Sequence, residues 1–248
     1  TWLVRLGLEQ NIAHFIFSST AAVYGHPQQL PVSEDAFLAP INPYGRSKLM
    51  SEWILQDVSK ANPDFNHVIL RYFNVAGADP RGRLGQSTPQ ATHLIKVACQ
   101  TALGHRDVLS IFGTDYPTPD GTGVRDYIHV SDLAAAHVQA LQWLEEGHPS
   151  ETFNCGYGHG FSVRDIISAV QEVSQSDLPV TAAERRAGDP AELVADPSKL
   201  KDAMRWSPQF DSLQLIVRTA LAWEQQQQRN PWPGQDSEMN SGNKGEML

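Results

Sequence analysis

One segment of the chain carries a phenol and an ammonium group four residues apart. Tyr44 and Lys48 lie in the run Asn-Pro-Tyr-Gly-Arg-Ser-Lys, and side chains at positions i and i+4 of a helix point to the same side. A tyrosine is ordinarily protonated near neutral pH, with a pKa of about 10, but a nearby positive charge favours the phenolate. Tyr44 could therefore act as an acid and as a base. The same spacing is also common on solvated helices, so the pair alone does not define a site.

Three hydroxyl side chains, Ser18, Ser19 and Thr20, follow the short apolar run 15–17. Such a run is typical of a buried parallel strand, and ligands of open α/β sheets collect at the carboxyl ends of strands. A hydroxyl cluster can equally form a turn or a helix cap. Strand-end hydroxyls followed by a helix with a Tyr-x-x-x-Lys motif are a more specific pattern than either part.

The elements around these residues predict an α/β protein. A second buried strand is expected at residues 68–70, and a helix between the two strands begins with Asn42 as its cap and Pro43 in its first position. Strand, helix and strand make one right-handed crossover unit. An amphipathic helix is expected over residues 1–13. Further helices are predicted over 90–103, 132–144, 162–174 and 213–227, and short strands over 109–112 and 152–155.

Composition excludes several classes of function. The 248 residues are 41% hydrophobic, enough for a substantial core. A net charge of -9 without a dense basic run argues against broad nucleic-acid binding, and no apolar stretch is long enough for a membrane span. Cys99 and Cys155 form no CxxC pair, and the nine histidines show no metal-ligand spacing. A reducing, cytoplasmic environment and no bound metal are therefore expected.

Five blocks of the sequence resemble the extended short-chain dehydrogenase/reductases and, within them, the UDP-glucose 4-epimerase family. They are residues 15–25, 44–48, 70–78, 111–130 and 185–189, and the resemblance extends from residue 1 to about 223. It implies a partial Rossmann-type, doubly wound parallel sheet that lacks its first strands, with a smaller α/β substrate-binding domain. The NAD-binding domain would comprise residues 1–74 and 131–157, and the UDP-sugar domain 75–130 and 158–224. The polar segment 225–248 is expected to be a disordered tail.

The resemblance implies a chemistry of transient sugar oxidation with tightly bound NAD. Tyr44 would take the proton of the sugar 4-hydroxyl while the C4 hydride passes to NAD, and the hydride would return to the opposite face of the 4-keto sugar. Lys48 would favour the phenolate and bind the nicotinamide ribose, and Thr20 would hold the sugar hydroxyl. The residues implied on the cofactor side are Ser18, Ser19, Tyr44, Lys48, Tyr72 and Phe73.

The resemblance also implies a set of substrate ligands and a homodimer. Arginine forms charge-assisted contacts with phosphate oxygens, and Arg125 and Arg186 match the family's ligands of the UDP diphosphate. Arg125 could instead form a structural ion pair with Asp126 or Asp132. The other residues implied at the substrate are Thr20, Asn74, Leu94, Phe112 and Asp189, with His93 unassigned and Leu193 at the position that limits pocket size. Family members dimerise through two helices, one of them corresponding to residues 43–59.

The sequence departs from the family pattern in its glycines. No glycine-rich turn that could receive a cofactor pyrophosphate follows a first strand. The run 156–160 has the spacing Gly-x-Gly-x-Gly, but Phe161 follows it where a glycine is needed, and Ser162 with Asp165 predicts a helix capping box. We interpret this run as a structural turn. The chain is therefore expected to lack the glycine loop, to bind NAD weakly in isolation and to expose strand edges that favour aggregation.

Two other functional classes are open to test. Related 4,6-dehydratases and decarboxylases carry acidic residues directly after the Ser-Thr of the strand end, where this chain has Ala21 and Ala22. Elimination of water needs an acid and a base at the sugar, and methyl groups supply neither, so epimerisation is favoured. The chain could also be a noncatalytic fragment or a dimerising module.

Overall fold

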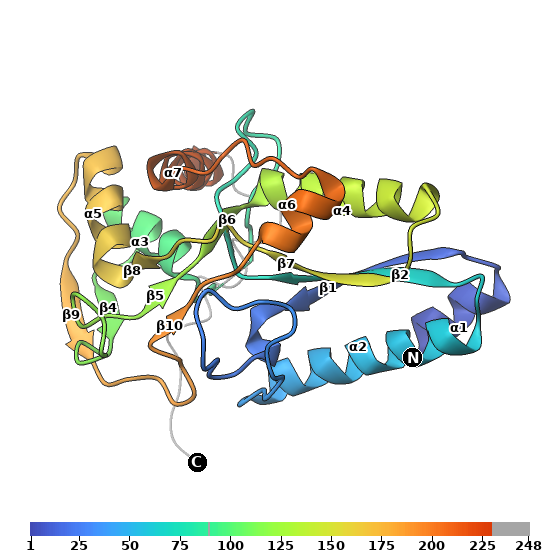
Figure 1. The fold of residues 1–248 in the computed structure, drawn as a ribbon. Helices are drawn as coiled ribbons and strands as arrows, with labels where there is room; N and C mark the ends of the chain where they lie inside the picture. Colours follow the sequence, from blue (N-terminus) through green and yellow to red (C-terminus); the bar gives the residue numbers. More distant parts are fainter. Residues whose placement is uncertain (89, 230–248) are drawn as a thin grey trace, which may run out of the picture.

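The computed structural model describes residues 1–88 and 90–229, and its element order is α/β throughout. Two regions can be distinguished in Figure 1. The sheet region contains three long strands with helices on both faces. The cap region contains three further helices and several short strands.

The sheet region is built on three parallel strands in the order β1–β2–β7. β1 spans His14–Thr20, β2 spans Asn66–Tyr72 and β7 spans Glu151–Cys155. Thr20 is paired with Tyr72, and Tyr72 with Cys155. The carboxyl ends of all three strands therefore lie at one edge, where ligands of open α/β sheets bind.

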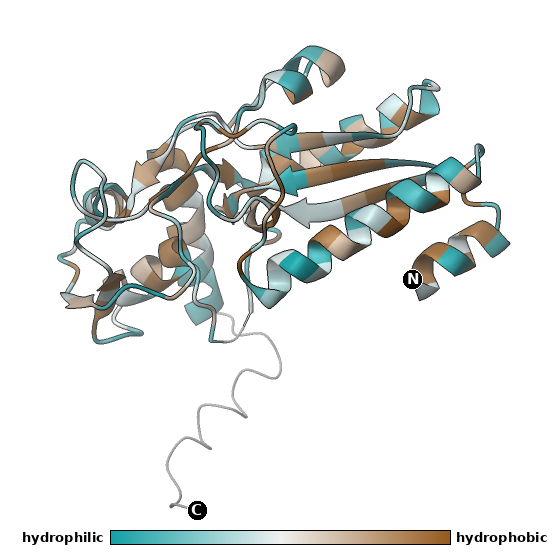
Figure 2. Ribbon diagram, turned by 60° about the horizontal axis from the view of Figure 1, so that its bottom comes forward, coloured by the Kyte–Doolittle hydropathy of each residue, from teal (hydrophilic) through white to brown (hydrophobic). Residues whose placement is uncertain are grey.

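Helices cover both faces of this sheet. α1 (Trp2–Glu9) and α2 (Pro43–Ala61) lie on one face, and α4 (Val130–Glu145) and α6 (Ser198–Met204) lie on the other (Figure 1). Hydrophobic residues run along the strands in Figure 2, with hydrophilic residues near the arrowheads. This pattern is expected of strands buried on two faces, whose polar residues gather where the strands leave the core.

The cap region contains α3, α5 and α7, which pack against one another. Short strands complete it: β4 pairs with β9, β5 lies between β8 and β10, and the pair β3–β6 joins it to the sheet region. The bounds are η1 Ala21–Val23, β3 Asn74–Ala76, α3 Leu94–Ala102, β4 Leu109–Phe112, β5 Val124–Arg125, β6 Tyr127–His129, β8 Phe161–Ser162, α5 Val163–Ser174, β9 Val180–Ala183, β10 Glu192–Leu193 and α7 Leu213–Arg229.

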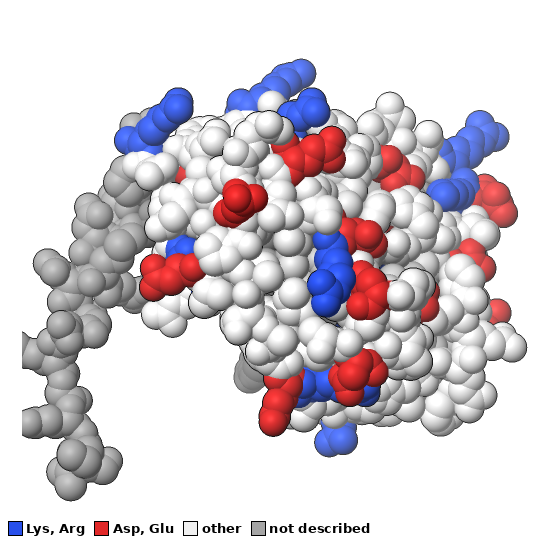
Figure 3. All heavy atoms as spheres, turned by 90° about the vertical axis from the view of Figure 1, so that its left-hand side faces the viewer, with Lys and Arg blue, Asp and Glu red and all other residues white. Residues whose placement is uncertain are grey.

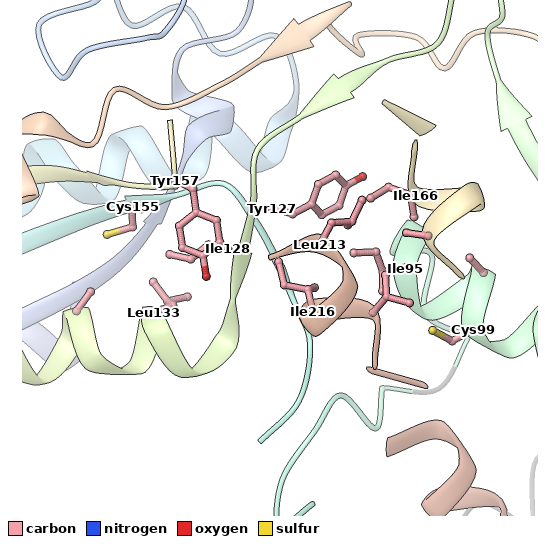
Figure 4. Packing of buried hydrophobic residues seen from close by; sticks show 14 of the residues in the cluster. Ile95, Cys99, Tyr127, Ile128, Leu133, Cys155, Tyr157, Ile166, Leu213 and Ile216 are labelled. Carbon is pink, nitrogen blue, oxygen red and sulfur yellow. The ribbon is translucent and has the colours of Figure 1, made fainter. Parts of the chain in front are cut away.

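One hydrophobic core extends through both regions. Its buried members include Leu70 and Phe153 of the sheet and Ile95, Ile166 and Ile216 of the cap helices. Figure 4 shows side chains of α3, α5 and α7 pointing toward one another beside Tyr127 of β6, whereas the next residue, Ile128, points to the other side, toward Tyr157 and Leu133. Since the apolar contacts are continuous, the cap region is held in a fixed position over the strand ends.

The structure confirms the α/β class, the parallel strands and the main helices, and corrects several details. The helix expected over 90–103 begins only at Leu94, with His93 at its N-cap. α7 continues to Arg229, so residues 225–229 of the expected disordered tail are helical, and residues 230–248 lie outside the described residues. The sequence did not predict α6 or β9.

The described part of the chain contains neither a membrane-spanning helix nor a cluster of metal-ligating side chains. No helix in ranges 1–88 and 90–229 is long and apolar enough to cross a membrane. The same residues hold no group of three or more His, Cys, Asp or Glu side chains arranged for a metal ion. Figure 3 shows basic and acidic side chains interspersed on one face of the cap region.

Candidate active site

The start of α2 is fixed by local sequence and by one close contact with η1. The Asn42 side chain accepts a hydrogen bond from the backbone N–H of Gly45 at 2.8 Å, and Pro43 occupies the first turn, as the sequence predicts. A Cβ atom at Gly45 would lie 2.6 Å from the carbonyl oxygen of Ala22. Only glycine therefore lets the helix approach η1 this closely, which brings Tyr44 to the carboxyl edge of the sheet.

Tyr44 and Lys48 lie together at this edge. The Lys48 Nζ atom is 5.9 Å from the centroid of the Tyr44 ring and 5.1 Å from that of Phe17. It donates a hydrogen bond to the carbonyl oxygen of Ser18 at 2.9 Å. Tyr44 is 51% exposed, so its phenol is accessible to a ligand. The predicted proximity of an ammonium, a phenol and the strand end is confirmed.

The three strand-end hydroxyls point in different directions. Thr20 lines a cavity, and its Oγ1 accepts the N–H of Ala22 at 3.2 Å. The Ser18 hydroxyl lies 3.0 Å from His137 Nε2 on α4. The Ser19 hydroxyl is completely buried and donates to Glu52 on α2. Because neighbouring side chains of a strand point to opposite faces, Ser19 faces the α2 interface, whereas Ser18 and Thr20 point away from it.

Most of the other candidate residues line one cavity of about 240 Å³ next to Thr20. It is bounded by the strand end and by the loop that precedes β10. The candidates among its lining residues are Thr20, Tyr72, Phe73, Asn74, Arg125, Asp189 and Leu193, together with Ala21 and Ala22 of η1. The tertiary structure thus brings together residues from widely separated blocks of the sequence.

Arg125 is held by the loop that precedes β10. Its guanidinium forms an ion pair with Asp189 and donates to the carbonyl oxygens of Val124 at 2.7 Å and Pro190 at 2.6 Å. The alternative prediction of a pair with Asp126 or Asp132 is wrong. Both of those carboxylates are buried and accept hydrogen bonds from other groups.

Three of the predicted substrate residues, Arg186, Phe112 and Leu94, do not line the 240 Å³ cavity. The guanidinium carbon of Arg186 stacks 3.9 Å from the centroid of the Phe112 ring, a cation–π contact. Leu94 lines a second cavity of about 630 Å³, together with His93. Asn74 lines both cavities. Asn74 therefore joins two cavities lined by predicted substrate residues, whereas Arg186 and Phe112 line neither of them.

Burial controls the ionisation of two tyrosines of the sheet region, Tyr72 and Tyr24. Burial raises the pKa of Tyr72, with a further increase from nearby Tyr44, while a hydrogen bond with Ser18 lowers it. Burial likewise raises the pKa of Tyr24 to about 12, although Arg71 acts in the opposite direction. Both phenols therefore remain protonated near neutral pH, and Tyr72 can serve as a hydrogen-bond donor.

The turn at residues 156–160 is structural, as the sequence predicts. The buried Asp126 carboxylate accepts the backbone N–H groups of Tyr157 at 2.9 Å and Gly158 at 3.0 Å. A Cβ at Gly156 would lie 2.5 Å from the Asp126 carboxylate. The glycine spacing thus wraps the backbone around an internal carboxylate. The expected capping box of Ser162 and Asp165 follows directly and starts α5.

Sequence reasoning missed a buried ion pair directly behind the site. Arg71 of β2 and Glu52 of α2 are 3% and 1% exposed, and Arg71 Nη2 lies 2.7 Å from Glu52 Oε2. The signal available in the sequence was weak: Glu52 follows Lys48 by one helical turn, and Arg71 is a charged residue inside an apolar strand. Neither feature identifies its partner.

Comparison with known proteins identifies the family. Residues 2–156 match the model of the NAD dependent epimerase/dehydratase family. Together with a three-stranded parallel sheet and a site at its carboxyl edge, this match shows that the chain belongs to that family.

Individual relatives are UDP-sugar epimerases. The chain is 58% identical to the UDP-glucose 4-epimerase of Azospirillum brasilense over 88% of its own length, and spans 62% of that relative. Among solved structures, the UDP-Glc/GlcNAc 4-epimerase of Campylobacter jejuni is 56% identical, with a TM-score of 0.76 over 90% of this chain and 68% of that chain. The UDP-glucose 4-epimerase of Bifidobacterium longum in complex with NAD+ and UDP is 38% identical, with a TM-score of 0.85 over 92% and 68%.

Proposed function

We propose that the protein is a 4-epimerase of UDP-sugars, with UDP-glucose and UDP-galactose as its main substrates, and that it works with bound NAD. The observation that carries this proposal is the arrangement at the sheet edge. Tyr44 and Lys48 lie at the start of α2, and beside them a cavity is lined by Thr20, Asn74 and Arg125. A proton-transferring phenol, a hydroxyl for the sugar and a cation for the diphosphate are thereby available together.

In this proposal, Tyr44 takes the proton of the sugar O4 and returns it after inversion. NAD, when bound, supplies the acceptor and then the donor of the C4 hydride. Lys48 contributes an ammonium group close to the Tyr44 ring, and a positive charge there favours the phenolate during proton transfer. Thr20 holds the sugar hydroxyl in place. The reaction is redox-neutral, since the hydride and the proton both return to the sugar.

Most of the residues proposed to hold the nucleotide line the two cavities, and two others, Arg186 and Phe112, stack on each other and line neither. Arg125 and Arg186 supply charge-assisted donors for the diphosphate, and Asp189 accepts a ligand hydroxyl. Phe112 and Asn74 contact the uridine, with Leu94 at the cavity that Asn74 shares. Leu193, 9% exposed in the cavity wall, limits the space beside the sugar.

Epimerisation fits the cavity better than elimination or decarboxylation. Ala21 and Ala22 form η1 directly after Thr20 and line the cavity. Asp189 is the sole carboxylate among the described residues lining the 240 Å³ cavity, and it is already paired with Arg125. Dehydration needs a further acid and base at the sugar. An epimerase needs only the tyrosine and a hydride carrier.

The fit to NAD is partial. At the nicotinamide end, Lys48, Ser18, Tyr72 and Phe73 gather at the carboxyl edge, and the protonated Tyr72 phenol suits a donor role. In the glycine run 156–160, the N–H groups of Tyr157 and Gly158 bond Asp126, so these two donors are not free for a pyrophosphate. We therefore expect residues 1–248 alone to bind NAD weakly and to be inactive as an isolated polypeptide. Micromolar or tighter binding in calorimetric titration would contradict this expectation.

We further propose a homodimer in a reducing, cytoplasmic environment. Both cysteines are free and buried, which fits such an environment. Met50 and Trp53 on α2 are each 52% exposed, and large apolar side chains on one helix are a suitable interface. The Trp53→Glu variant should elute as a monomer in light-scattering chromatography if α2 is the interface. A dimer of unchanged mass would refute this assignment.

The Tyr44→Phe variant tests the proposed mechanism. In the full-length protein, interconversion of UDP-glucose and UDP-galactose should fall by about 10²–10⁴-fold, because loss of a general acid–base typically costs that much. UDP binding measured by calorimetry should stay within roughly twofold, because the phenyl ring keeps the shape of the site. Thr101→Val, a change remote from the site, is a suitable control. Undiminished turnover in Tyr44→Phe would remove the mechanism.

A further inference from the structure

Behind Tyr44 and Lys48 lies a buried network of charged and polar groups that the proposed chemistry does not use. Its centre is Arg71 on β2, which makes two-pronged contacts with Glu52: Nη2 to Oε2 at 2.7 Å and Nε to Oε1 at 3.1 Å. The Ser19 hydroxyl of β1 donates to the same carboxylate. One carboxylate of α2 is therefore bonded to two neighbouring strands.

The network continues from Arg71 to the third strand and to the loop that follows η1. Arg71 Nη1 donates to the Tyr24 hydroxyl at 3.0 Å, and that hydroxyl donates to Asn154 Oδ1 of β7 at 2.6 Å. Arg71 Nη1 also donates to the Glu34 carbonyl oxygen at 3.2 Å. Every residue in this chain of bonds except Glu34 is buried. The donors and acceptors at its centre are matched, as buried polar groups require.

The spacing along α2 links this network to the candidate active site. Tyr44, Lys48 and Glu52 follow one another at intervals of one helical turn, so they lie along one stripe of the helix. Lys48 bonds the Ser18 carbonyl, and Glu52 bonds the hydroxyl of the next residue, Ser19. Two adjacent contacts on β1 thus determine both the rotation of α2 about its axis and its position along that axis.

We propose that Glu52 and Arg71 are positioning residues, which lock α2 against the sheet so that Tyr44 and Lys48 stand at a fixed place beside Thr20. This proposal rests on the proposed function for its catalytic part. A buried ion pair directs geometry strongly, because any displacement of α2 leaves a charge without its partner in an apolar interior. The apolar contacts of α2, made by Leu49 and Leu55, are non-directional.

The variant that tests the proposal is Glu52→Gln, which keeps the shape of the side chain and removes its charge. In the full-length protein, kcat for UDP-glucose interconversion should fall by about 100-fold, the effect of a displacement of roughly 1 Å. KM should change by less than about threefold, because Arg125 and Asn74 lie outside the network. Amide hydrogen exchange should become faster over residues 43–61 and remain unchanged over α5.

The pair of Lys96 and Glu224 is the matched control. It is also a buried Lys/Arg–Glu pair, it joins α3 to α7, and its side chains are 8% and 7% exposed. Glu224→Gln should lower thermal stability and accelerate exchange in α3 and α7, while exchange over residues 43–61 stays unchanged. Ser19→Ala removes one hydrogen bond of the network and leaves the ion pair, so it should give an intermediate loss of kcat. This milder variant keeps the proposal testable if Glu52→Gln fails to fold.

The exchange and activity measurements together decide whether Glu52 and Arg71 anchor α2 and position the site. Unchanged exchange over residues 43–61 in Glu52→Gln would overturn the anchoring role, whatever the activity. Faster exchange with full kcat would show that the pair stabilises α2 without positioning the site, and would overturn the catalytic part. If the unmodified protein does not interconvert the sugars, the proposed function fails. Faster amide hydrogen exchange confined to α2 in Glu52→Gln would still establish that the ion pair anchors α2 to the sheet.

Discussion

The two sides of the candidate site are held by different kinds of interaction. On the sheet side, Glu52 and Arg71 are nearly inaccessible to solvent and are bonded to three strands through Ser19 and Asn154. On the cap side, Arg125 is 13% exposed and its partner Asp189 is 40% exposed. A charge that water cannot reach is stabilised only by its partner. At a partly exposed site, water can replace the partner.

This difference fits a division of labour between the two sides. The groups proposed to transfer a proton need a fixed geometry, because catalysis is sensitive to small displacements. The groups proposed to bind the nucleotide must exchange contacts within the cap side for contacts with a ligand. Arg186, which stacks on Phe112, and Arg125, which pairs with Asp189, can make such an exchange at little cost.

The largest expected contrast is in stability. Arg71→Met should lower the free energy of unfolding by about 3–5 kcal/mol, because it leaves Glu52 buried without a counter-charge. Asp189→Asn should lower it by about 1 kcal/mol or less, because its carboxylate is partly solvated. Urea denaturation of both variants measures the difference. Equal losses in the two variants would mean that the sheet side is not held more firmly than the cap side.

A smaller effect is expected on ligand affinity at the cap side. Arg125→Gln should weaken UDP binding roughly tenfold to a hundredfold, the usual value of a charge-assisted hydrogen bond, while the unfolding midpoint shifts little. Arg185→Gln is the control, since Arg185 pairs with Asp115 on the surface. Calorimetric titration with UDP separates the two. Unchanged affinity in Arg125→Gln would remove Arg125 from the proposed diphosphate site.

The smallest effect concerns pH, and it involves both regions. Burial lowers the pKa of His67 on β2 and of His129 before α4, although nearby carboxylates act in the opposite direction. The unfolded chain therefore binds protons first as pH falls below the ordinary histidine pKa of about 6.5. Stability should be fully present above that pH and should decrease toward the lower pKa values of the folded state.

Melting temperatures measured between pH 7.5 and 5.5 test this expectation. His129 accepts the Ser131 N–H at 3.0 Å and lies 3.1 Å from the Thr219 hydroxyl, so protonation disrupts a bond. His129→Gln should be less stable at pH 7.5 and should show a shallower decline toward acid. A decline as steep as that of the unmodified protein would assign the acid sensitivity to other groups, such as His67.

The sequence by itself determined the local elements and the chemical types at the site. Asn42 and Pro43 predicted the start of α2, and Ser162 with Asp165 predicted the start of α5, because helix caps depend only on neighbouring residues. The stripe of Tyr44 and Lys48 followed from helix periodicity. These features were readable because the interacting residues lie within one or two turns of each other.

Only the tertiary structure decided which distant groups meet. It bonded Ser19 to Glu52, gave Arg125 the partner Asp189 in place of Asp126 or Asp132, and joined Asn74 to both cavities. Such contacts depend on strand order and on helix packing. A single sequence does not specify which buried polar groups strand order and helix packing bring within hydrogen-bond distance. These hydrogen bonds become strong only after the apolar core has formed and excluded water.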